Sequence, residues 1–335
     1  RLNVKPGDNV VINDIVRERV EFSREVIDDQ VLIKTDGFPT YHMANVVDDH
    51  LMGITHVIRG EEWLSSTPKH ILLYNAFGWE LPEFAHLPLL LNKDRSKLSK
   101  RQGDVAVEDY KAKGYLKEAL LNFVALLGWS AGDNEEFFTL EYMIDNFSLE
   151  RVHKAGAIFN VEKLNWLNAE HLRKKDKSEI LNMLKEELAK SKYKDLKLSD
   201  YYLLLIIEAM LERVSFVKEY IDNSPYFFER PTTYDDEVVK KRWKDDSVEL
   251  LIKYVEKLSA LDTPSKVDYE VALKQVAEEA ECGVGRIIHP VRLATSGVGI
   301  GPGVYDLLFI LGKDEVITRI NDALKVIPEI KMKIN

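Results

Sequence analysis

The chain has 335 residues, of which 45% are hydrophobic and 30% are charged, so it is long enough to bury a large core in two or three domains. No stretch reaches the roughly 18 uninterrupted apolar residues of a membrane helix, and a single cysteine excludes a disulfide framework or a cysteine-rich zinc site. The formal net charge of -10 means that any nucleic-acid partner must be met by local basic patches. We therefore expect a cytoplasmic protein with no membrane role.

Residues 1 to 35 alternate apolar and polar positions in short runs, which turn formers such as Pro6 and Gly7 separate. Such a pattern is typical of short β-strands. The chain starts at Arg1 without an initiator Met or the layout of a signal peptide, so we interpret this start as a cut edge. The runs that we predict to be strands are Val10–Ile12, Val20–Phe22 and Val31–Ile33.

Helical and strand patterns alternate between residues 41 and 91. This alternation indicates an α/β unit with a parallel sheet, whose ligands normally lie beyond the carboxyl ends of the strands. Arg59 and the loop 92–103 follow such ends. In chain order, the predicted elements are a helix from Tyr41 to His50, a strand Ile54–Ile58, a helix opened by Thr67 as cap and Pro68, and a strand Phe84–Leu91.

After about residue 105 the strand patterns stop and helical periods take over. Apolar residues then recur at helical spacing, as at Leu116, Ala119, Leu120 and Phe123. We therefore predict that the rest of the chain is mainly α-helical and closes with one amphipathic helix from Val304.

A strongly basic loop, Asp94–Gly103, follows the last strand of the α/β unit. Lys97 and Lys100 stand three residues apart, so both can approach one polyanion, and an ammonium group suits charge that moves during displacement at a phosphate. Backbone N–H groups and the hydroxyls of Ser96 and Ser99 add donors. The residues leave two interpretations open, a phosphate site and an ordinary solvated turn.

A second group of candidate residues lies between Asp36 and Trp63. Tyr41 and Asn45 are four residues apart and share one face of the predicted helix. Arg59, at the end of the next strand, can meet them across a pocket and pair bidentately with a carboxylate. The alternative is that Tyr41 packs at the helix start and Arg59 forms a structural ion pair.

The acidic and histidine residues of this region show no metal-ligand pattern. Asp48 and Asp49 are adjacent and point to different parts of a helix, which argues against paired-carboxylate chemistry. We expect no metal site and no protein-bound zinc, and we expect the histidines to be polar surface or hydrogen-bonded core residues. These histidines are His42, His50, His56, His70 and His86.

The segment Asp36–Trp63 followed by Lys97–Arg101, in this order and separation, resembles bacterial-type glutamyl-tRNA synthetase, a class I enzyme. The resemblance implies a partial Rossmann-type nucleotide-binding domain of the α/β class followed by mainly α-helical tRNA-binding domains. It also implies an ATP-dependent ligase that converts L-glutamate to glutamyl-adenylate and transfers it to the 3′ end of tRNA. The resemblance continues at Tyr110–Trp129, Val161–Asn168, His289–Ala294 and Leu307–Lys313.

The resemblance also implies roles for single residues. Lys97, Ser99 and Lys100 fall in the second signature of class I synthetases, whose lysines stabilise the ATP phosphates, so Lys97 and Lys100 are the predicted catalytic residues. Trp63 falls on a position near the ATP, and Mg²⁺ is implied as the companion of ATP. The positions implied to bind glutamate are Tyr41, Asn45, Arg59 and Glu62.

One departure from the family pattern is the absence of its first signature, a His-x-Gly-His-like motif. The strand and loop that supply a further glutamate-binding arginine are absent as well. Binding of adenine and activation of the α-phosphate depend on that portion. We therefore expect the chain to be the C-terminal portion of the enzyme, with no detectable aminoacylation activity by itself.

The resemblance implies four domains and a tRNA partner. Basic clusters in the helical part, such as Lys240–Arg242, suit RNA phosphates. We expect a monomer, and the residues leave open whether glutamine tRNA is also charged. The implied domains are 1–104, the C-terminal part of the catalytic domain with the tail of its acceptor-binding insertion; 105–168, a connecting helical domain; and 169–235 and 236–335, two anticodon-binding subdomains.

Two other functions compete with the ligase reading. A non-catalytic tRNA-binding module would use the helical part without the chemistry. A shorter relative of the family glutamylates a modified base in tRNA, but it lacks anticodon-binding domains. That absence disagrees with the roughly 170 residues that follow Leu164 here.

Overall fold

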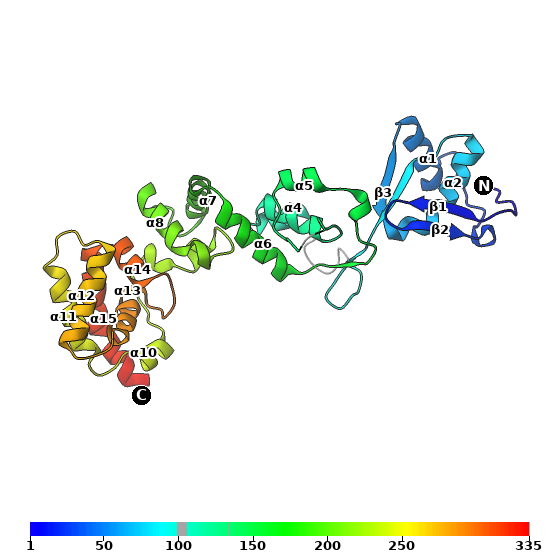
Figure 1. The fold of residues 1–335 in the computed structure, drawn as a ribbon. Helices are drawn as coiled ribbons and strands as arrows, with labels where there is room; N and C mark the ends of the chain where they lie inside the picture. Colours follow the sequence, from blue (N-terminus) through cyan, green and yellow to red (C-terminus); the bar gives the residue numbers. More distant parts are fainter. Residues whose placement is uncertain (99–105, 133, 335) are drawn as a thin grey trace. The chain divides into compact units, whose positions relative to one another are not determined.

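The computed structural model describes residues 1–98, 106–132 and 134–334, so Ser99 and Lys100 lie outside the described residues (Figure 1). The chain divides into two compact units, Arg1–Leu167 and Asn168–Asn335. Every strand found among the described residues lies in the first unit, and the second unit is helical. The predicted order, an α/β part followed by a mainly helical part, is confirmed.

The first unit contains a four-stranded sheet with the strand order β2-β1-β4-β3. β4 runs parallel to β1 and to β3, as predicted, but β1 and β2 form an antiparallel hairpin, so the sheet is mixed. A second, two-stranded parallel sheet pairs β5 with β6. The strands are β1 Val10–Asp14, β2 Glu18–Phe22, β3 His56–Gly60, β4 Glu83–Leu87, β5 Leu90–Leu91 and β6 Ala157–Ile158.

Helix α2 packs on the main sheet and supports the strand ends. Ile71 of α2 is buried together with Val10 and Ile12 of β1 and Phe84 of β4. Pro68 stands in the first turn of α2, where its missing N–H costs nothing, and Gly78 ends the helix with φ +72°. The two predicted helices are confirmed as α1 Tyr41–Leu51 and α2 Thr67–Phe77, with Ser66 rather than Thr67 as the cap.

Two strand predictions need correction. Val31–Ile33 is no strand, because it meets residues 38–40 through a single bridge between Ile33 and Pro39, and helix α1 begins at Tyr41 directly after it, which ends the pairing. The run Phe84–Leu91 is two strands, because Pro88 separates β4 from β5 and the two join different sheets. The root of the basic loop therefore lies on the small β5–β6 sheet.

The remainder of the first unit is helical and has its own core. Phe123 and Leu127 are buried with Leu164 and Leu167 of α6, and the boundary between the two units falls within this helix. Single-turn 3-10 helices occur at Arg24–Val26 and Leu149–Arg151, and a longer one, η2, at Glu61–Ser66. The α-helices are α3 Val107–Ala112, α4 Lys117–Leu126, α5 Leu140–Asn146 and α6 Val161–Lys174.

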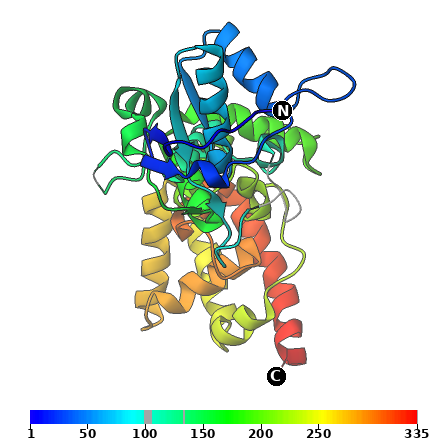
Figure 2. The ribbon, with the colours of Figure 1, turned by 90° about the vertical axis from the view of Figure 1, so that its right-hand side faces the viewer.

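The second unit is a helical assembly in which α11, α12, α13 and α15 surround one large core (Figure 2). Leu250, Leu251, Tyr254 and Leu258 line the buried face of α11 at helical spacing. Gly312, with φ +80°, divides the predicted closing helix into α14 and α15. The helices are α7 Lys177–Lys190, α8 Asp200–Met210, α9 Glu219–Asp222, α10 Asp236–Arg242, α11 Ser247–Ser259, α12 Lys266–Glu279, α13 Gly285–Ser296, α14 Val304–Leu311 and α15 Lys313–Ile334, with 3-10 turns at Leu211–Arg213 and Pro225–Phe227.

Candidate active site

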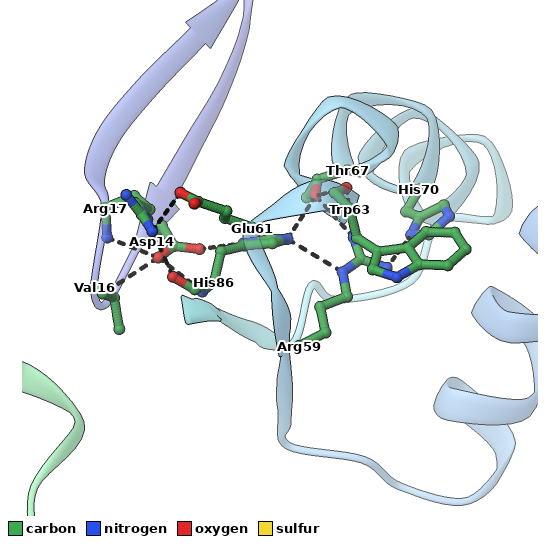
Figure 3. A network of polar contacts seen from close by, with 9 residues as sticks. All are labelled: Asp14, Val16, Arg17, Arg59, Glu61, Trp63, Thr67, His70 and His86. Carbon is green, nitrogen blue, oxygen red and sulfur yellow. Dashed lines mark hydrogen bonds and ion pairs between the residues drawn. The ribbon is translucent and has the colours of Figure 1, made fainter. Parts of the chain in front are cut away.

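Arg59 is the centre of a polar network at the carboxyl end of β3 (Figure 3). Its Nε donates to Nε2 of His86 at 3.1 Å, its Nη2 donates to Oγ1 of Thr67 at 2.8 Å, and its Nη1 lies 3.4 Å from Nδ1 of His70. Among the residues that the structure describes, no carboxylate lies within ion-pair distance of this guanidinium. Burial lowers the pKa of Arg59, and the nearby Tyr41 hydroxyl works in the opposite direction.

His86 and Asp14 lie behind Arg59 in the sheet. Arg59 and His86 are register partners in the parallel pair β3 and β4, and Asp14 ends β1 on the other side of β4. The Nδ1 atom of His86 is 2.5 Å from Oδ2 of Asp14, and both side chains are buried. Burial raises the pKa of Asp14, but hydrogen bonds from the His86 side chain and from backbone N–H groups outweigh it, so the pKa is lower than usual.

A short row of histidines extends from Arg59 toward α1. Nε2 of His70 lies 2.9 Å from Nδ1 of His42, and His70 is a buried residue of α2. Burial, followed by the positive charge of Arg59, lowers the pKa of His70 to about 3. Burial also lowers the pKa of His42, with further contributions from Lys69 and Arg59. His70 is therefore neutral at physiological pH, and it adds no positive charge beside Arg59.

Two exposed aromatic rings stand over the guanidinium. The ring centroids of Tyr41 and Trp63 are 4.9 Å apart, and the Arg59 guanidinium carbon is 6.0 Å from the centroid of Trp63. Tyr41 is 50% exposed and Trp63 is 38% exposed, so both rings have free surface for a ligand. The structure thus brings together Tyr41, Arg59 and Trp63.

Asn45 lies one turn after Tyr41 on α1, but it contacts a different partner. Its Nδ2 donates to Oδ2 of Asp49 at 2.9 Å. Burial raises the pKa of Asp49, although the Asn45 hydrogen bond and the charge of Arg59 lower it in part. The predicted shared face of Tyr41 and Asn45 therefore exists, while direct contact between Asn45 and Arg59 does not.

The described part of the basic loop is a tight turn. The backbone N–H of Asn92 donates to the carbonyl of Ser96 at 2.8 Å, and the Ser96 hydroxyl donates to Asp94 at 2.6 Å. Lys97 forms an isolated antiparallel bridge with Leu91, so its backbone is tied to β5. The resemblance implies ATP-binding roles for Trp63 and for three loop residues, and of these four only Trp63 and Lys97 fall within the described residues.

Lys97 is linked to the wall that carries Trp63. Its Nζ lies 3.1 Å from Oε1 of Glu62, the second residue of η2. Backbone hydrogen bonding, followed by the bond from Lys97, lowers the pKa of Glu62 despite partial burial. Through this ion pair, two predicted site residues from distant parts of the sequence meet.

A cationic cavity of about 340 Å³ lies in the second unit. Burial lowers the pKa of Arg292, whose Nη2 donates to the carbonyl of Pro302 at 2.7 Å. Burial also lowers the pKa of His289, and the charges of Arg242, Arg292 and Lys241 add to this effect. The cavity is lined by Glu237, Val238, Lys241, Arg242, His289, Arg292, Gly299 and Ile300.

The sequence reasoning missed four polar residues of the Arg59 network: Asp14, Thr67, His70 and His86. It expected the histidines to be surface or hydrogen-bonded core residues, and His70 and His86 are of the second kind. One signal was present, since His86 interrupts the otherwise apolar run Phe84–Leu91 and a histidine buried in a strand needs polar partners. The identity of those partners depends on the strand order.

Among the described residues, no group of three or more histidine, cysteine, aspartate or glutamate side chains is arranged to hold a metal ion. None of the helices in that part of the chain combines the length and the apolar character needed to cross a membrane.

Two family models match the chain. The model described as tRNA synthetases class I (E and Q), catalytic domain, matches residues 1–166, and the model described as anticodon binding domain matches residues 179–324.

Curated relatives and solved structures agree with these matches. Glutamate–tRNA ligases of Chloroherpeton thalassium and Chlorobium chlorochromatii are each 51% identical, over 97% and 98% of this chain and 66% and 67% of their own lengths. The crystal structure of a glutamate tRNA ligase from Elizabethkingia meningosepticum in complex with its amino acid matches with a TM-score of 0.90 and 39% identity, over 97% of this chain and 67% of that one. The chain therefore spans about two thirds of the length of the relatives that it matches.

Proposed function

Because the chain belongs to the class I tRNA synthetases for glutamate and glutamine, we propose that it forms part of a glutamate–tRNA ligase. Such an enzyme activates L-glutamate with ATP to glutamyl-adenylate and transfers the glutamyl group to the 3′ end of tRNA. The proposal covers the reaction, its substrates and the cytoplasm as its location. We also propose that the enzyme is a monomer.

The observation that carries the proposal is the state of Arg59. A partly buried guanidinium normally pairs directly with a carboxylate, yet the described side chains that contact it are those of His86, Thr67 and His70. The guanidinium has no direct ion-pair partner among the described residues and faces a wall of two exposed aromatic rings. A carboxylate of glutamate would supply the missing negative charge, and an arginine can hold it with two parallel hydrogen bonds.

The remaining glutamate contacts are proposed from the same wall. Tyr41 and Asn45, on one face of α1, offer a hydroxyl and an amide to the substrate. Glu62 is the residue proposed to attract the substrate ammonium group. Its lowered pKa supports a charged carboxylate there.

ATP is proposed to bind between η2 and the basic loop. The exposed Trp63 ring offers an apolar surface to the nucleotide. Lys97, Ser99 and Lys100 are proposed to hold the phosphates, with Lys97 and Lys100 following the charge as pyrophosphate leaves. Mg²⁺ enters with ATP and neutralises phosphate charge, and no metal ligand from the protein is proposed.

The second unit is proposed to bind tRNA. Its match to an anticodon binding domain and its cavity lined by Lys241, Arg242 and Arg292 support this role. The four-part division into 1–104, 105–168, 169–235 and 236–335 stays a proposal. It subdivides each of the two units.

Calorimetric titration of the chain with L-glutamate tests the proposal. Arg59→Lys is expected to weaken binding about tenfold or more, because an ammonium group cannot offer two parallel donors. Arg19→Lys is the matched control, since Arg19 is exposed on β2 and pairs with Glu21. Equal glutamate affinity in Arg59→Lys and wild type, or equal competition by glutamine, would contradict the proposal.

A non-catalytic tRNA-binding role is the second candidate, and the cationic cavity of the second unit favours it. Filter binding of the chain with tRNA, measured beside its calorimetric titration with L-glutamate, separates the two functions. Retained tRNA affinity without glutamate binding favours the module, and glutamate binding at Arg59 favours the ligase.

A further inference from the structure

The side chains that orient Arg59 lie on the side of β3 that faces β4 and α2. β3 is the outermost strand of its sheet, so the residues that hold the guanidinium come from β4 and from the start of α2. His86 on β4 supplies the acceptor for Nε, and Thr67 supplies the acceptor for Nη2. The Thr67 hydroxyl can itself donate to the carbonyl of Trp63 at 3.3 Å or to Nε2 of His86 at 3.1 Å. The position of Arg59 therefore depends on His86 being an acceptor at Nε2.

His86 can accept at Nε2 in only one protonation state. The Nε of arginine always carries a proton, so Nε2 of His86, 3.1 Å away, must be unprotonated. The proton of the neutral ring must then lie on Nδ1, where Asp14 accepts it at 2.5 Å. A histidine protonated on both nitrogens would set two donors against each other at Arg59.

Asp14 is built to remain a charged acceptor. Its Oδ1 accepts from the backbone N–H groups of Val16 at 3.0 Å, Arg17 at 2.8 Å and His86 at 3.1 Å. These bonds use one carboxylate oxygen fully and leave Oδ2 for the His86 ring. The side chain is buried, so water does not compete for it.

We propose that Asp14 and His86 are positioning residues for glutamate recognition: Asp14 fixes the His86 proton on Nδ1, and the free Nε2 holds Arg59 with its remaining donors toward the substrate carboxylate. The inference rests on the proposed role of Arg59. Neither residue touches the substrate, so their effect passes entirely through the guanidinium.

Asp14→Asn is the sharpest test because it changes little except the proton position. The amide oxygen of Asn keeps the three backbone hydrogen bonds of Oδ1, so the turn after β1 retains its support. The amide nitrogen then faces Nδ1 of His86 as a donor, which moves the ring proton to Nε2. That proton opposes the Nε–H of Arg59 and turns the guanidinium away.

The first measurement is the tautomer itself. In the ¹⁵N-histidine NMR spectrum of the wild-type chain, His86 is expected to be protonated at Nδ1 and unprotonated at Nε2, with its signal identified by loss in His86→Gln. In Asp14→Asn the two nitrogens are expected to exchange roles. A wild-type His86 protonated at Nε2 overturns the inference, whatever the fold of the variant.

The second measurement is ligand affinity. Asp14→Asn is expected to weaken L-glutamate binding about tenfold, the effect of losing one hydrogen bond to a charged group, while affinity for pyrophosphate, the ligand of the basic loop, stays within about twofold of wild type. Asp8→Asn, an exposed aspartate of the same unit, is the matched control and leaves both affinities unchanged. A general loss of structure would weaken both ligands together and would count against a positioning role.

The outcomes separate this inference from the proposed function. A wild-type chain that does not bind glutamate contradicts the proposed function, and the positioning role falls with it. A wild-type chain that binds glutamate, together with an Asp14→Asn variant that binds it equally well, overturns the positioning role alone.

Discussion

Nζ of Lys97 lies 3.1 Å from Oε1 of Glu62, so the first lysine of the basic loop is paired with the 3-10 helix that carries Trp63. Both side chains are largely exposed, and such a pair is weak and exchangeable. A phosphate oxygen that approaches Lys97 must compete with the Glu62 carboxylate. Without ATP, the basic loop is therefore held to the proposed ATP site by the ion pair between Lys97 and Glu62.

Glu62→Gln is expected to strengthen pyrophosphate binding by up to about fivefold at low salt, because it removes the carboxylate that competes for Lys97. Calorimetric titration with pyrophosphate at two salt concentrations measures this change. Glu162→Gln is the matched control, since Glu162 pairs with Lys93, just before the same loop. Weaker pyrophosphate binding in Glu62→Gln than in the control would show that the pair assists the phosphate site.

His70 makes the stability of the first unit depend on pH. Its pKa is lowered from 6.5 to about 3, so the unfolded chain takes up a proton below pH 6.5 that the folded chain refuses. The free energy of unfolding is therefore full above pH 6.5 and falls as the pH drops toward 3, by up to ~1.4 kcal/mol per pH unit. Hydrogen exchange of α2 amides between pH 7 and 5 should show this slope. His70→Gln should flatten it, and the exposed His56→Gln should not.

Leu251 tests the core of the second unit. The side chain is fully buried among α11, α12, α13 and α15, so Leu251→Ala is expected to lower the free energy of unfolding by about 2–5 kcal/mol. Ile252→Ala, at the next position and 45% exposed, should change it by about 0.5 kcal/mol. Urea unfolding followed by the fluorescence of the buried Trp243 measures both. Equal effects of the two variants would contradict the packing described for α11.

Lys241 tests the cationic cavity as a tRNA contact. Lys241→Gln is expected to weaken tRNA binding and to reduce the slope of log affinity against log salt by about 0.7–0.9, the release of one counterion. Filter binding at several salt concentrations measures the slope. Lys253→Gln, an exposed lysine of α11 paired with Glu249, should leave the slope unchanged. A salt slope that is the same in all three proteins would exclude a phosphate contact at Lys241.

Local patterns were enough to predict much of the fold. Alternation predicted β1 and β2, and the Thr67-Pro68 signal predicted the start of α2, since these signals act within a few residues. Features that depend on distant pairing escaped prediction. The predicted strand at Val31–Ile33 was wrong because the facing segment enters helix α1 at Tyr41, and the antiparallel β1–β2 pair made the sheet mixed.

The candidate site shows the same division. Arg59 was predicted from its place at the end of a strand and Trp63 from the family resemblance, and the structure brings them together with Tyr41. The partners of Arg59 were not predicted, because Asp14 and His86 are 72 residues apart and meet only through the order of β1 and β4. The roles of all these residues in binding stay predictions, including those of Ser99 and Lys100, which lie outside the described residues.

β3, the strand that carries Arg59, is an edge strand of the described sheet. Within the described residues, β3 hydrogen-bonds to β4 along one side only, and Ile58 on this strand is 49% exposed. Peptide groups along the other side are a template for strand addition, by a further segment or by a second copy of the chain at high concentration. Any such addition would add a strand to the sheet next to Arg59. The edge that is open to strand addition is therefore on the same strand that carries the proposed glutamate-binding arginine.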